Sequence, residues 1–573
     1  MSVSLDNPAD AAHTAGGRPA AAWAVGRVLF LALGVVAWAA IFVLPLLTLY
    51  AGAGTESPPA SSAPPQGPGG ESGETPWAAG SAGWMRSIGL AAAIAALAVI
   101  LGYVPGRLIG TADLFSARAG RGHTRQVMLL LLLLAPLLLP SYVLYYAWAL
   151  LLSPTSALGG YLCARPEAAR FAGTLTSAAV LMLWHWPLAA MLIAQGWRNI
   201  DGEVMEIARL DAGGVRRFLA VTLPLLGGAM GLAFGLCFVL ALSEFTTFHL
   251  SGLRTVGTQL ALLFDQTHDE RLVARAAWPL FVPAAAVALV LWKRMFWNPQ
   301  PQEGAWAVRA DLKERRRGWV VLVWLMGISF LAPLALLAFH LREASAVRDF
   351  YRLHRDELAW SACIAAAAAG VSLWIASAAM GIGARAGARR GGYVAAAPKG
   401  LSALMHVTIL LAMLLPPSLL AVSLLRLMAW LDLPSALRQS WVVVSAGLVM
   451  RYAGLSVIVL GFTRAGENRH LSEMAAADGA SPGQAWLHVH LPRLWPLPAG
   501  ALLLGVMFGL TEVPSTLVLL PPGVPNFAQT LMNQMHYLRD QHVIVSCLAL
   551  IAAYAVLAVL VVAILSRLIR RAV

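Results

Sequence analysis

Charged residues are scarce in this chain. Asp, Glu, Lys and Arg make up 12% of its 573 residues, whereas hydrophobic residues make up 59%, and the mean hydropathy is +0.70. About 25% of the residues of a soluble globular protein are charged, so the low value excludes an ordinary soluble enzyme. The apolar content also excludes a disordered chain, which combines low hydrophobicity with high net charge. The composition predicts a membrane protein.

Cysteine and lysine are also rare, and each shortage excludes one kind of chemistry. Three cysteines fall in apolar stretches and one stands alone in a loop, so we expect no disulfide framework: Cys237, Cys363, Cys547 and Cys163. A Walker A loop needs Gly-Lys followed by Ser or Thr. The lysines of this chain are instead followed by Arg, Glu and Gly, at Lys293, Lys313 and Lys399. We therefore expect no nucleotide site of that kind, and no enzyme.

Long apolar runs recur along the whole chain. A membrane-spanning helix needs about 20 mainly apolar residues. By this criterion the sequence offers twelve candidate spans, near residues 28–50, 87–109, 126–152, 171–195, 224–247, 276–295, 318–340, 359–383, 401–430, 440–462, 494–520 and 545–567. The first run is too long for a signal peptide and no small-residue cleavage site follows it, so we interpret it as a retained anchor.

The formal net charge of +13 is best explained as a topology signal. Lys and Arg concentrate in every second connection between the candidate spans and at the C-terminal end, and the positive-inside rule then predicts that both termini lie in the cytoplasm. This explanation leaves little charge for a nucleic-acid partner, and we expect none. The main basic segments contain Lys293, Arg294, Arg309, Lys313, Arg315, Arg316, Arg317, Arg385, Arg389, Arg390, Lys399, Arg567, Arg570 and Arg571.

An internal repeat divides the chain into two halves. Residues 206–224 read EIARLDAGGVRRFLAVTLP and residues 473–492 read EMAAADGASPGQAWLHVHLP. Each segment follows the fourth candidate span of its half, on the predicted cytoplasmic side. Because each half has an even number of spans, the halves point the same way. We therefore predict an all-α integral membrane fold of twelve helices in two parallel six-helix repeats.

This repeat predicts the following division of the chain. Residues 1–27 form a cytoplasmic tail, 28–295 and 318–573 form the two six-helix domains, and 296–317 form a cytoplasmic linker. The stretch 51–82 consists mainly of Gly, Pro, Ser and Ala, so we expect it to be a mobile periplasmic loop without a core.

The repeated segment itself has the signals of a helix, a turn and a second helix. Glu473 to Ala477 favour a short helix, and Gly479 allows the chain to turn. Ser481 can cap a new helix, with Pro482 at its first position and Gln484 three residues after the cap. The apolar residues Trp486, Leu487 and Val489 give this second element an apolar face. Such a protrusion could transmit movement from a soluble partner, or it could be a well-capped connector without a partner.

The pattern E-x-A-x-x-D-G-A with a terminal Leu-Pro resembles the EAA loop of permeases of binding-protein-dependent ABC importers. The resemblance implies a fold similar to type I importer permeases, in a bacterial inner membrane. It assigns ATPase coupling to Glu206, Ala208, Asp211, Gly213, Leu223 and Pro224, and to Glu473, Ala475, Asp478, Gly479, Leu491 and Pro492. The first copy is one residue shorter and lacks a counterpart of Gly479, so Gly213 or Gly214 is expected to supply its turn.

The same resemblance implies three partners. Two copies of a cytoplasmic ABC ATPase would bind the loops, and a periplasmic or lipid-anchored binding protein would deliver the cargo. ATP and Mg²⁺ would be bound by the ATPase, so we expect no cofactor in this chain. A secondary transporter with twelve spans, driven by an ion gradient, is the rival interpretation. It explains the parallel repeat but not the two protruding loops.

Three of the ionisable residues inside candidate spans stand out, because such residues are costly in a membrane and usually functional. Glu244 and Glu512 lie 268 positions apart and therefore correspond in the repeat, and Arg451 lies in the tenth span. The glutamates could face each other and line the path of a cation. Alternatively, Arg451 could be the counter-ion of Glu512 and the pair could simply join two helices.

Other polar residues of the chain favour structural roles. His185 is expected to be an interior histidine. His268 and His536 show no recognisable metal-ligand spacing, so we predict no metal site and expect both at the periplasmic surface. The charges of one outside loop favour a solvated helical face or docking of an acidic partner: Arg342, Arg348, Arg352, Arg355, Asp349, Asp356 and Glu357. We expect breaks in the third and ninth spans at Pro136, Pro140, Pro416 and Pro417.

The cargo is indicated only by two short stretches. Residues 512–523, EVPSTLVLLPPG, resemble the E-L-P-A-T-L…P-P-G segment of ferric-iron permeases, and Pro140-Ser141-Tyr142-Val143 is similar to a P-x-Y-V segment of the same group. Paired carboxylates also suit a trivalent cation better than an anion. We therefore expect ferric iron as the cargo, with thiamine, phosphonate or another small solute as alternatives.

Overall fold

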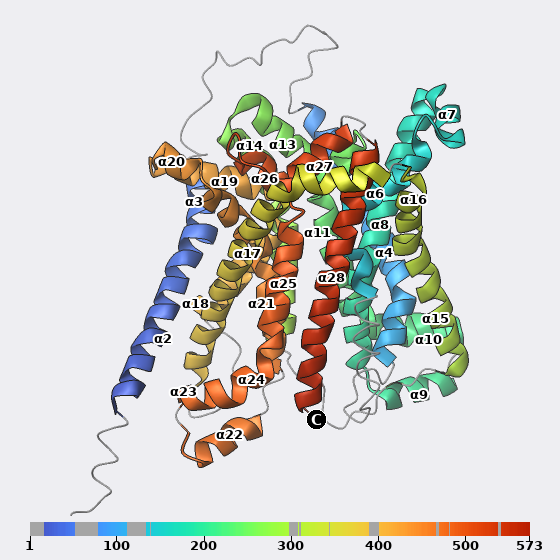
Figure 1. Cartoon of the computed structure of the whole chain (residues 1–573). Helices are drawn as coiled ribbons and strands as arrows, with labels where there is room; N and C mark the ends of the chain where they lie inside the picture. Colours follow the sequence, from blue (N-terminus) through green and yellow to red (C-terminus); the bar gives the residue numbers. More distant parts are fainter. Residues whose placement is uncertain are drawn as a thin grey trace, which may run out of the picture.

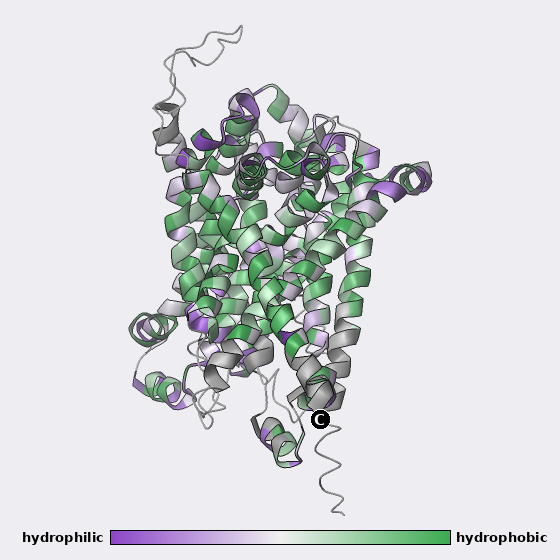
Figure 2. Ribbon diagram, turned by 90° about the vertical axis from the view of Figure 1, so that its left-hand side faces the viewer, coloured by the Kyte–Doolittle hydropathy of each residue, from purple (hydrophilic) through white to green (hydrophobic). Residues whose placement is uncertain are grey.

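The computed structural model describes residues 17–51, 78–111, 133–137, 139–211, 213–296, 308, 311–342, 344–388, 400–465, 469–480, 482–536 and 540–572. Within these ranges the chain is helical and contains no β-strand. The long helices run side by side as a bundle (Figure 1). Hydrophobic residues occupy the middle of the helices and hydrophilic residues gather toward both ends (Figure 2). The protein is therefore an α-helical, multi-pass membrane protein.

Several of the helices before residue 300 end at polar residues, among them Arg198, Asp211 and Thr267. Short non-α turns join several of them: the π-helical segments η1 and η3 and the 3₁₀ turn η2. In chain order the elements are α2 (Gly17–Trp38), η1 (Ala39–Val43), α3 (Leu44–Ala51), α4 (Ala78–Thr111), α6 (Ser141–Ala149), η2 (Leu150–Leu152), α7 (Ala157–Cys163), α8 (Pro166–Arg198), α9 (Gly202–Asp211), α10 (Gly214–Arg217), η3 (Phe218–Thr222), α11 (Leu223–Leu242), α12 (Thr246–Leu250), α13 (Val256–Thr267) and α14 (Glu270–Phe296).

The helices after residue 310 follow in a similar order. They are α15 (Leu312–Met326), the π-helical η4 (Gly327–Leu331), α16 (Ala332–His340), α17 (Ala344–Ala388), α18 (Leu401–Leu414), α19 (Pro417–Trp430), α20 (Ser435–Arg438), α21 (Trp441–Ala465), α22 (Arg469–Ala477), α23 (Pro482–Ala485), the π-helical η5 (Trp486–His490), α24 (Leu491–Leu494), α25 (Pro496–Gly509), α26 (Pro514–Leu519), α27 (Phe527–His536) and α28 (Asp540–Ala572).

Each of the twelve candidate spans falls on an apolar helix, but three of them differ from a simple span. Among the described residues, nine helices are long and apolar enough to cross a membrane. The expected span at 401–430 is a pair, α18 and α19, bent by 117° at Pro416. The spans expected at 126–152 and 494–520 contain only the shorter apolar helices Ser141–Leu152 and Pro496–Gly509. The first of these begins only after Pro140, which is the N-cap of α6, and the chain unwinds at Thr511 after the second.

Proline explains all four π-helical segments. Each segment is five residues long, and a proline follows two residues after its end, at Pro45, Pro224, Pro333 and Pro492. Proline lacks the N–H group that would bond to the carbonyl four residues earlier, and its ring pushes that carbonyl away. The preceding residue then bonds five residues back, as Leu44 does to Ala39 and Leu223 to Phe218. Each of these prolines, three of them preceded by Leu and Pro333 by Ala332, therefore widens one turn of the helix by one residue.

Helices from the part of the chain before residue 300 pack against helices from the part after residue 310. Gly34 of α2 lies against Ala378 of α17, and Gly318 of α15 lies against Leu108 of α4. The first helix of each part thus packs on the second helix of the other. The core shows the same exchange, because residues of α6 pack in a cluster with Phe527 and neighbours from α25, α27 and α28. Residues of α19 likewise pack with α3, α13 and α14. These swapped contacts join the two parts into one core.

The two ends of the bundle carry different elements. The lower end in Figure 1 carries α9, α10, α22, α23 and the C-terminal end of the chain. The upper end carries α7, α13, α20 and α27, and the first turns of α17 run along it before the helix descends. Both copies of the repeated segment therefore lie at the same, lower end.

Candidate functional site

The repeated segments form two loops of similar construction at the lower end. The first loop consists of α9, α10 and η3, and the second consists of α22, α23 and η5 (Figure 1). The π-helical segments begin at Phe218 and Trp486, 268 positions apart; the first leads directly into α11, and the second leads through the short α24 and a turn at Trp495 into α25. In both loops, one amphipathic helix is therefore followed by a turn, a short helix and a continuous connection to the bundle.

The turns of the two loops differ. In the second loop Gly479 has a φ of 75°, and the Ala480 N–H donates to the Ala475 carbonyl oxygen at 3.0 Å, which closes the end of α22. Pro482 begins α23, as the sequence predicted; Ser481 lies outside the described residues. In the first loop Gly213 has a φ of −63° and an extended backbone. The first loop thus turns without a left-handed glycine at Gly213 or Gly214, because its shorter connection enters α10 from an extended residue.

Equivalent residues of the two loops have the same exposure. Glu206 and Glu473 are exposed, as are Asp211 and Asp478, whereas Ala208 and Ala475 are buried. The alanines face the body of the protein, and the acidic side chains point outward. Both Leu-Pro pairs lie at the joints to the bundle, with exposed prolines and half-buried leucines: Leu223, Pro224, Leu491 and Pro492.

Apolar side chains also point outward from both loops. On α9 the exposed residues Val204, Ile207 and Leu210 repeat every three positions, and Leu210 is 88% exposed. On the second loop Met474 and Leu487 are exposed. Contiguous exposed apolar groups beside acidic residues are typical of a protein interaction surface. The two loops therefore present similar surfaces in the same direction.

A charge network fastens the first loop to the bundle. Arg209 of α9 lies 3.7 Å from an oxygen of Asp311 and 3.6 Å from an oxygen of Glu314. Glu314 also pairs with Arg107 of α4 at 2.6 Å, and Arg107 stacks on Trp197 of α8. We call these four charged residues the loop-1 brace: Arg107, Arg209, Asp311 and Glu314. The position of the second loop that corresponds to Arg209 is Ala476, which cannot form an ion pair.

Inside the bundle, Glu244 and Glu512 occupy equivalent breaks between helices. Glu244 lies between α11 and α12, and its Oε1 accepts hydrogen bonds from the N–H and the hydroxyl of Thr247, at 3.1 and 2.8 Å. Glu512 lies between α25 and α26, and its Oε1 accepts from the N–H and the hydroxyl of Ser515, at 3.4 and 3.0 Å. Each carboxylate thus caps the short helix that follows it.

Additional donors hold each carboxylate in place. The hydroxyl of Ser141 donates to Glu244 at 3.0 Å, and the hydroxyl of Tyr452 donates to the second oxygen of Glu512. Glu512 is only 5% exposed. All of these partners are neutral donors, which compensate the loss of water around a carboxylate only in part. We call Ser141, Glu244, Thr247, Tyr452, Glu512 and Ser515 the carboxylate layer.

Helix α6 contacts both carboxylate segments. Its first residue, Ser141, binds Glu244, and the hydroxyl of the next residue, Tyr142, donates to the Thr511 carbonyl oxygen at 3.4 Å. The Thr511 hydroxyl in turn lies 2.9 Å from that of Tyr554. The segment Pro140 to Val143 therefore links the surroundings of Glu244 with those of Glu512.

Arg451 binds backbone carbonyls and not Glu512, the partner in one of the two alternatives from the sequence. Its Nη1 donates to the carbonyl oxygens of Met413 and Leu415 at 2.6 and 3.1 Å, and the Ser243 hydroxyl donates to the Leu414 carbonyl oxygen at 3.1 Å. These carbonyls end α18 at its 117° bend, where Pro416 and Pro417 remove the helical donors. Among the described residues Arg451 and Glu512 form no ion pair, so Arg451 acts here as a cap of α18.

The remaining histidines of the sequence analysis have local partners. His185 is fully buried and its Nδ1 lies 2.6 Å from the Leu181 carbonyl oxygen, which agrees with an interior histidine. His268 ends α13 at the upper end in a left-handed conformation, and nothing is described of the His536 side chain. Over the described ranges no group of three His, Cys, Asp or Glu is placed to hold a metal ion.

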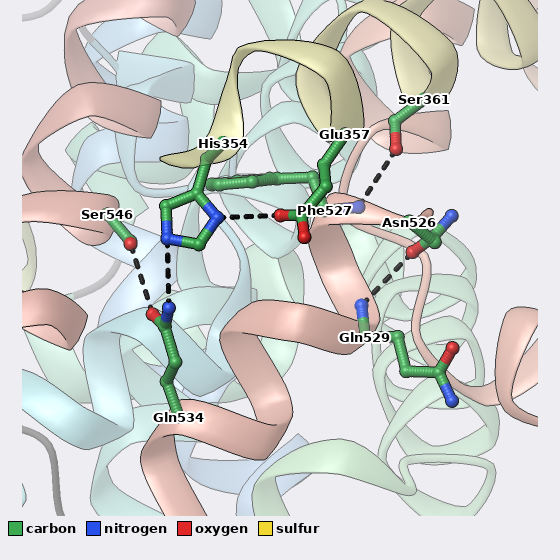
Figure 3. A network of polar contacts seen from close by, with 8 residues as sticks. All are labelled: His354, Glu357, Ser361, Asn526, Phe527, Gln529, Gln534 and Ser546. Atoms are coloured by element: carbon green, nitrogen blue, oxygen red, sulfur yellow. Dashed lines mark hydrogen bonds and ion pairs between the residues drawn. The ribbon is translucent and has the colours of Figure 1, made fainter. Parts of the chain in front are cut away.

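At the upper end, α13 and α27 begin in the same way. The Ser87 hydroxyl of α4 accepts from the N–H of Val256, the first residue of α13, at 3.1 Å. The Ser361 hydroxyl of α17 accepts from the N–H of Phe527, the first residue of α27, at 3.0 Å (Figure 3). This correspondence was missed in the sequence, because two isolated serines give no pattern that separates them from other serines.

A second polar network fixes the outer turns of α17. His354 lies between Glu357 at 2.7 Å and Gln534 at 3.0 Å, and Gln534 accepts from Ser546 at 3.3 Å (Figure 3). The neighbouring charged residues of α17 are exposed, with Arg355 and Asp356 paired at 3.5 Å. This arrangement fits the expected solvated helical face, and it joins α17 to α27 and α28.

Comparison of the chain with protein-family models, with curated proteins and with solved structures found no match.

Proposed function

We propose that this chain is the membrane-spanning permease subunit of an ATP-driven ABC importer. One observation carries the proposal: two loops of the same construction lie at the same end of the bundle and expose equivalent acidic and apolar residues. Two equivalent surfaces suit a partner that is itself a dimer. The resemblance to EAA loops identifies that partner as a cytoplasmic ABC ATPase, with ATP and Mg²⁺ bound by the ATPase.

The same arrangement supports twelve spans in two parallel halves. Among the described residues there are nine long apolar helices, the bent pair of α18 and α19, and two shorter apolar helices, which would together make twelve crossings. The π-helical segments, the glutamate breaks and the serine-capped outer helices recur at corresponding positions. We infer that a pseudo-twofold axis along the membrane normal relates the halves, with the lower end in the cytoplasm of a bacterial inner membrane and both termini there.

Mechanical continuity explains how such a subunit could work. The first loop is joined to α11 through η3, and the second to α25 through η5 and α24. Closure of an ATPase dimer would move both loops together, and these joints would pass the movement to the breaks that carry Glu244 and Glu512. The periplasmic or lipid-anchored binding protein would deliver its cargo at the upper end. The chain itself performs no chemistry on the cargo.

Ferric iron is the cargo that the sequence favours. The support comes from the two resembling stretches and from the carboxylate layer, where neutral donors leave the negative charges uncompensated. Thiamine and phosphonate remain alternatives. A gradient-driven secondary transporter would also use carboxylates, but it gives no reason for two exposed loops with matched surfaces.

Uptake of radiolabelled ferric iron into membrane vesicles tests the proposal. Vesicles containing the chain, an ABC ATPase and a binding protein encoded beside it should lose uptake in vanadate and retain it with a protonophore. The opposite pattern would establish the secondary transporter. Vanadate-sensitive uptake of thiamine or phosphonate, without iron uptake, would keep the ABC assignment and correct the cargo.

A further inference from the structure

A small cavity lies at the lower end of the bundle, beside the first loop. Its volume is about 160 Å³, and it lies where the end of α8, the start of α9, the beginning of α11 and the end of α14 meet. The lining residues are Gly196, Asn199, Ile200, Asp201, Val204, Leu225, Ala229 and Arg294. None of them belongs to the carboxylate layer or to the loop-1 brace.

Opposite charges line this cavity. Arg294 of α14 is exposed and forms no ion pair with any described residue, and its Nη2 lies so close to Gly228 that a Cβ there would collide with it. Asp201 also lines the cavity, and one of its oxygens caps α9 by accepting from the Glu203 N–H at 3.0 Å. Asn199 ends α8, and the C-terminal end of a helix carries partial negative charge. The cavity therefore suits a group with a negative part and a positive part.

The size of the cavity limits what can enter. Its volume of about 160 Å³ is smaller than the roughly 300 Å³ of the smallest drug-sized pockets. A small polar group fits, while the remainder of a larger ligand must lie outside. Exposed apolar residues continue from the cavity along the bundle: Leu225 on α11, and Leu289 and Val290 on α14. This surface is suitable for acyl chains.

The position also agrees with a lipid ligand. Pockets between helices at the end of a bundle lie level with phospholipid headgroups, and a cationic side chain there, such as Arg294, can bind the lipid phosphate. The charges that line the cavity discriminate between anionic lipids and zwitterionic lipids with an ammonium group. Asp201 and the end of α8 would repel a second negative group, but they attract an ammonium group.

We propose that this cavity binds the headgroup of phosphatidylethanolamine. Arg294 and the side-chain amide of Asn199 bind the phosphate, and the ammonium donates to Asp201 and to the carbonyl end of α8. Because Asp201 caps α9, the bound lipid joins the start of the first loop to α11 and α14. Positions 468 and 562, which correspond to Asp201 and Arg294 in the repeat, are Asn and Val. One such lipid per chain follows.

The proposal requires that the chain spans a membrane, but it does not depend on ATPase coupling or on the cargo. Native mass spectrometry of the full-length chain, released from nanodiscs of defined lipid, measures it directly. We expect one retained phosphatidylethanolamine per chain in mixtures with phosphatidylglycerol. Phosphatidylcholine should bind at least about tenfold more weakly, because its quaternary ammonium cannot donate a hydrogen bond to Asp201.

Arg294→Gln should lower the retained lipid about tenfold, and Gly228→Ala should lower it by displacing Arg294. The matched control is Lys293→Gln, which removes an exposed charge beside the cavity without altering its lining. Equal retention of phosphatidylglycerol, or equal losses for Arg294→Gln and Lys293→Gln, would overturn the proposal. Competition by millimolar inorganic phosphate would instead assign the cavity to a free phosphate. The folded state of each variant is checked by its unfolding temperature in the same nanodiscs.

Discussion

The carboxylate of Glu314 lies 2.6 Å from the guanidinium of Arg107 and 3.6 Å from that of Arg209. Glu314 belongs to α15, the first helix after residue 310, whereas the arginines belong to α4 and α9. The first loop is therefore fastened to helices from both parts of the chain. A movement of α9 reaches α15 directly, without passing through the apolar core.

We expect Glu314→Gln to reduce the cargo transported per ATP hydrolysed, because both arginines lose a charged partner. The three side chains are about one quarter exposed, so the loss of stability should be small, about 1 kcal/mol or less. Uptake and hydrolysis measured in the same proteoliposomes give the ratio. Asp356→Asn, which breaks the exposed pair with Arg355, is the control and should leave the ratio unchanged. Equal effects of the two variants would contradict a role for the brace.

The two loop glycines provide a test in which only the backbone angle differs. A Cβ added at Gly479 or at Gly213 would meet nothing within 4 Å, but Gly479 has a φ of 75° and Gly213 a φ of −63°. Gly479→Ala should therefore strain the second turn by about 1 kcal/mol and weaken binding of the ATPase. Gly213→Ala should leave binding unaffected.

Titration of the purified ATPase onto each variant, reconstituted in nanodiscs, measures both affinities. If the two variants bind alike, the turn at Gly479 does not set the shape of the coupling surface. Glu473→Ala provides a second readout, because it removes an exposed acidic group of the same loop without changing the backbone.

Substitutions in the carboxylate layer can test transport without disturbing the fold. In Glu244→Gln with Glu512→Gln, each side chain keeps one carbonyl oxygen that can accept from Thr247 or Ser515, so the helix caps survive. We expect uptake to fall at least about tenfold, while the unfolding temperature and ATPase binding stay near those of the parent. Ferric uptake at the parental rate in the folded double variant would remove these carboxylates from the transport path.

Sequence patterns predicted the features that depend on local chemistry. The Leu-Pro pairs, the glycine at position 479 and the long apolar runs each act on their own segment, and the structure has the turn and helices that they indicate. The equivalence of Glu244 and Glu512 followed from the repeat offset alone. Two of the predicted spans contain shorter helices than expected. Pro140 and the break at Thr511 interrupt these helices, although the apolar sequence continues past both points.

Partners distant in the sequence could not be predicted in this way. Pairing of Arg451 with Glu512 was one of two alternatives, but Arg451 binds the carbonyls of residues 413 and 415, which become available only because α18 ends at the bend. The loop-1 brace joins residues more than 100 positions apart, and His354 meets Gln534 through the packing of α17 on α27. In each case the choice of partner depends on how helices pack, which residue spacing does not encode.

The role of Arg451 can be separated from that of a counter-ion by one double-mutant cycle. Arg451→Met removes the donor to Met413 and Leu415, so we expect a loss of about 1–3 kcal/mol from unsatisfied carbonyls at the bend. If Arg451 neutralised Glu512, adding Glu512→Gln would restore most of that stability, because no unpaired charge would remain. If Arg451 instead caps α18, adding Glu512→Gln to Arg451→Met should restore no stability. The two losses of stability should then add to within about 0.5 kcal/mol. Unfolding of the four proteins in detergent, followed by tryptophan fluorescence, gives the coupling energy, and a rescue above about 1 kcal/mol would restore the ion-pair hypothesis.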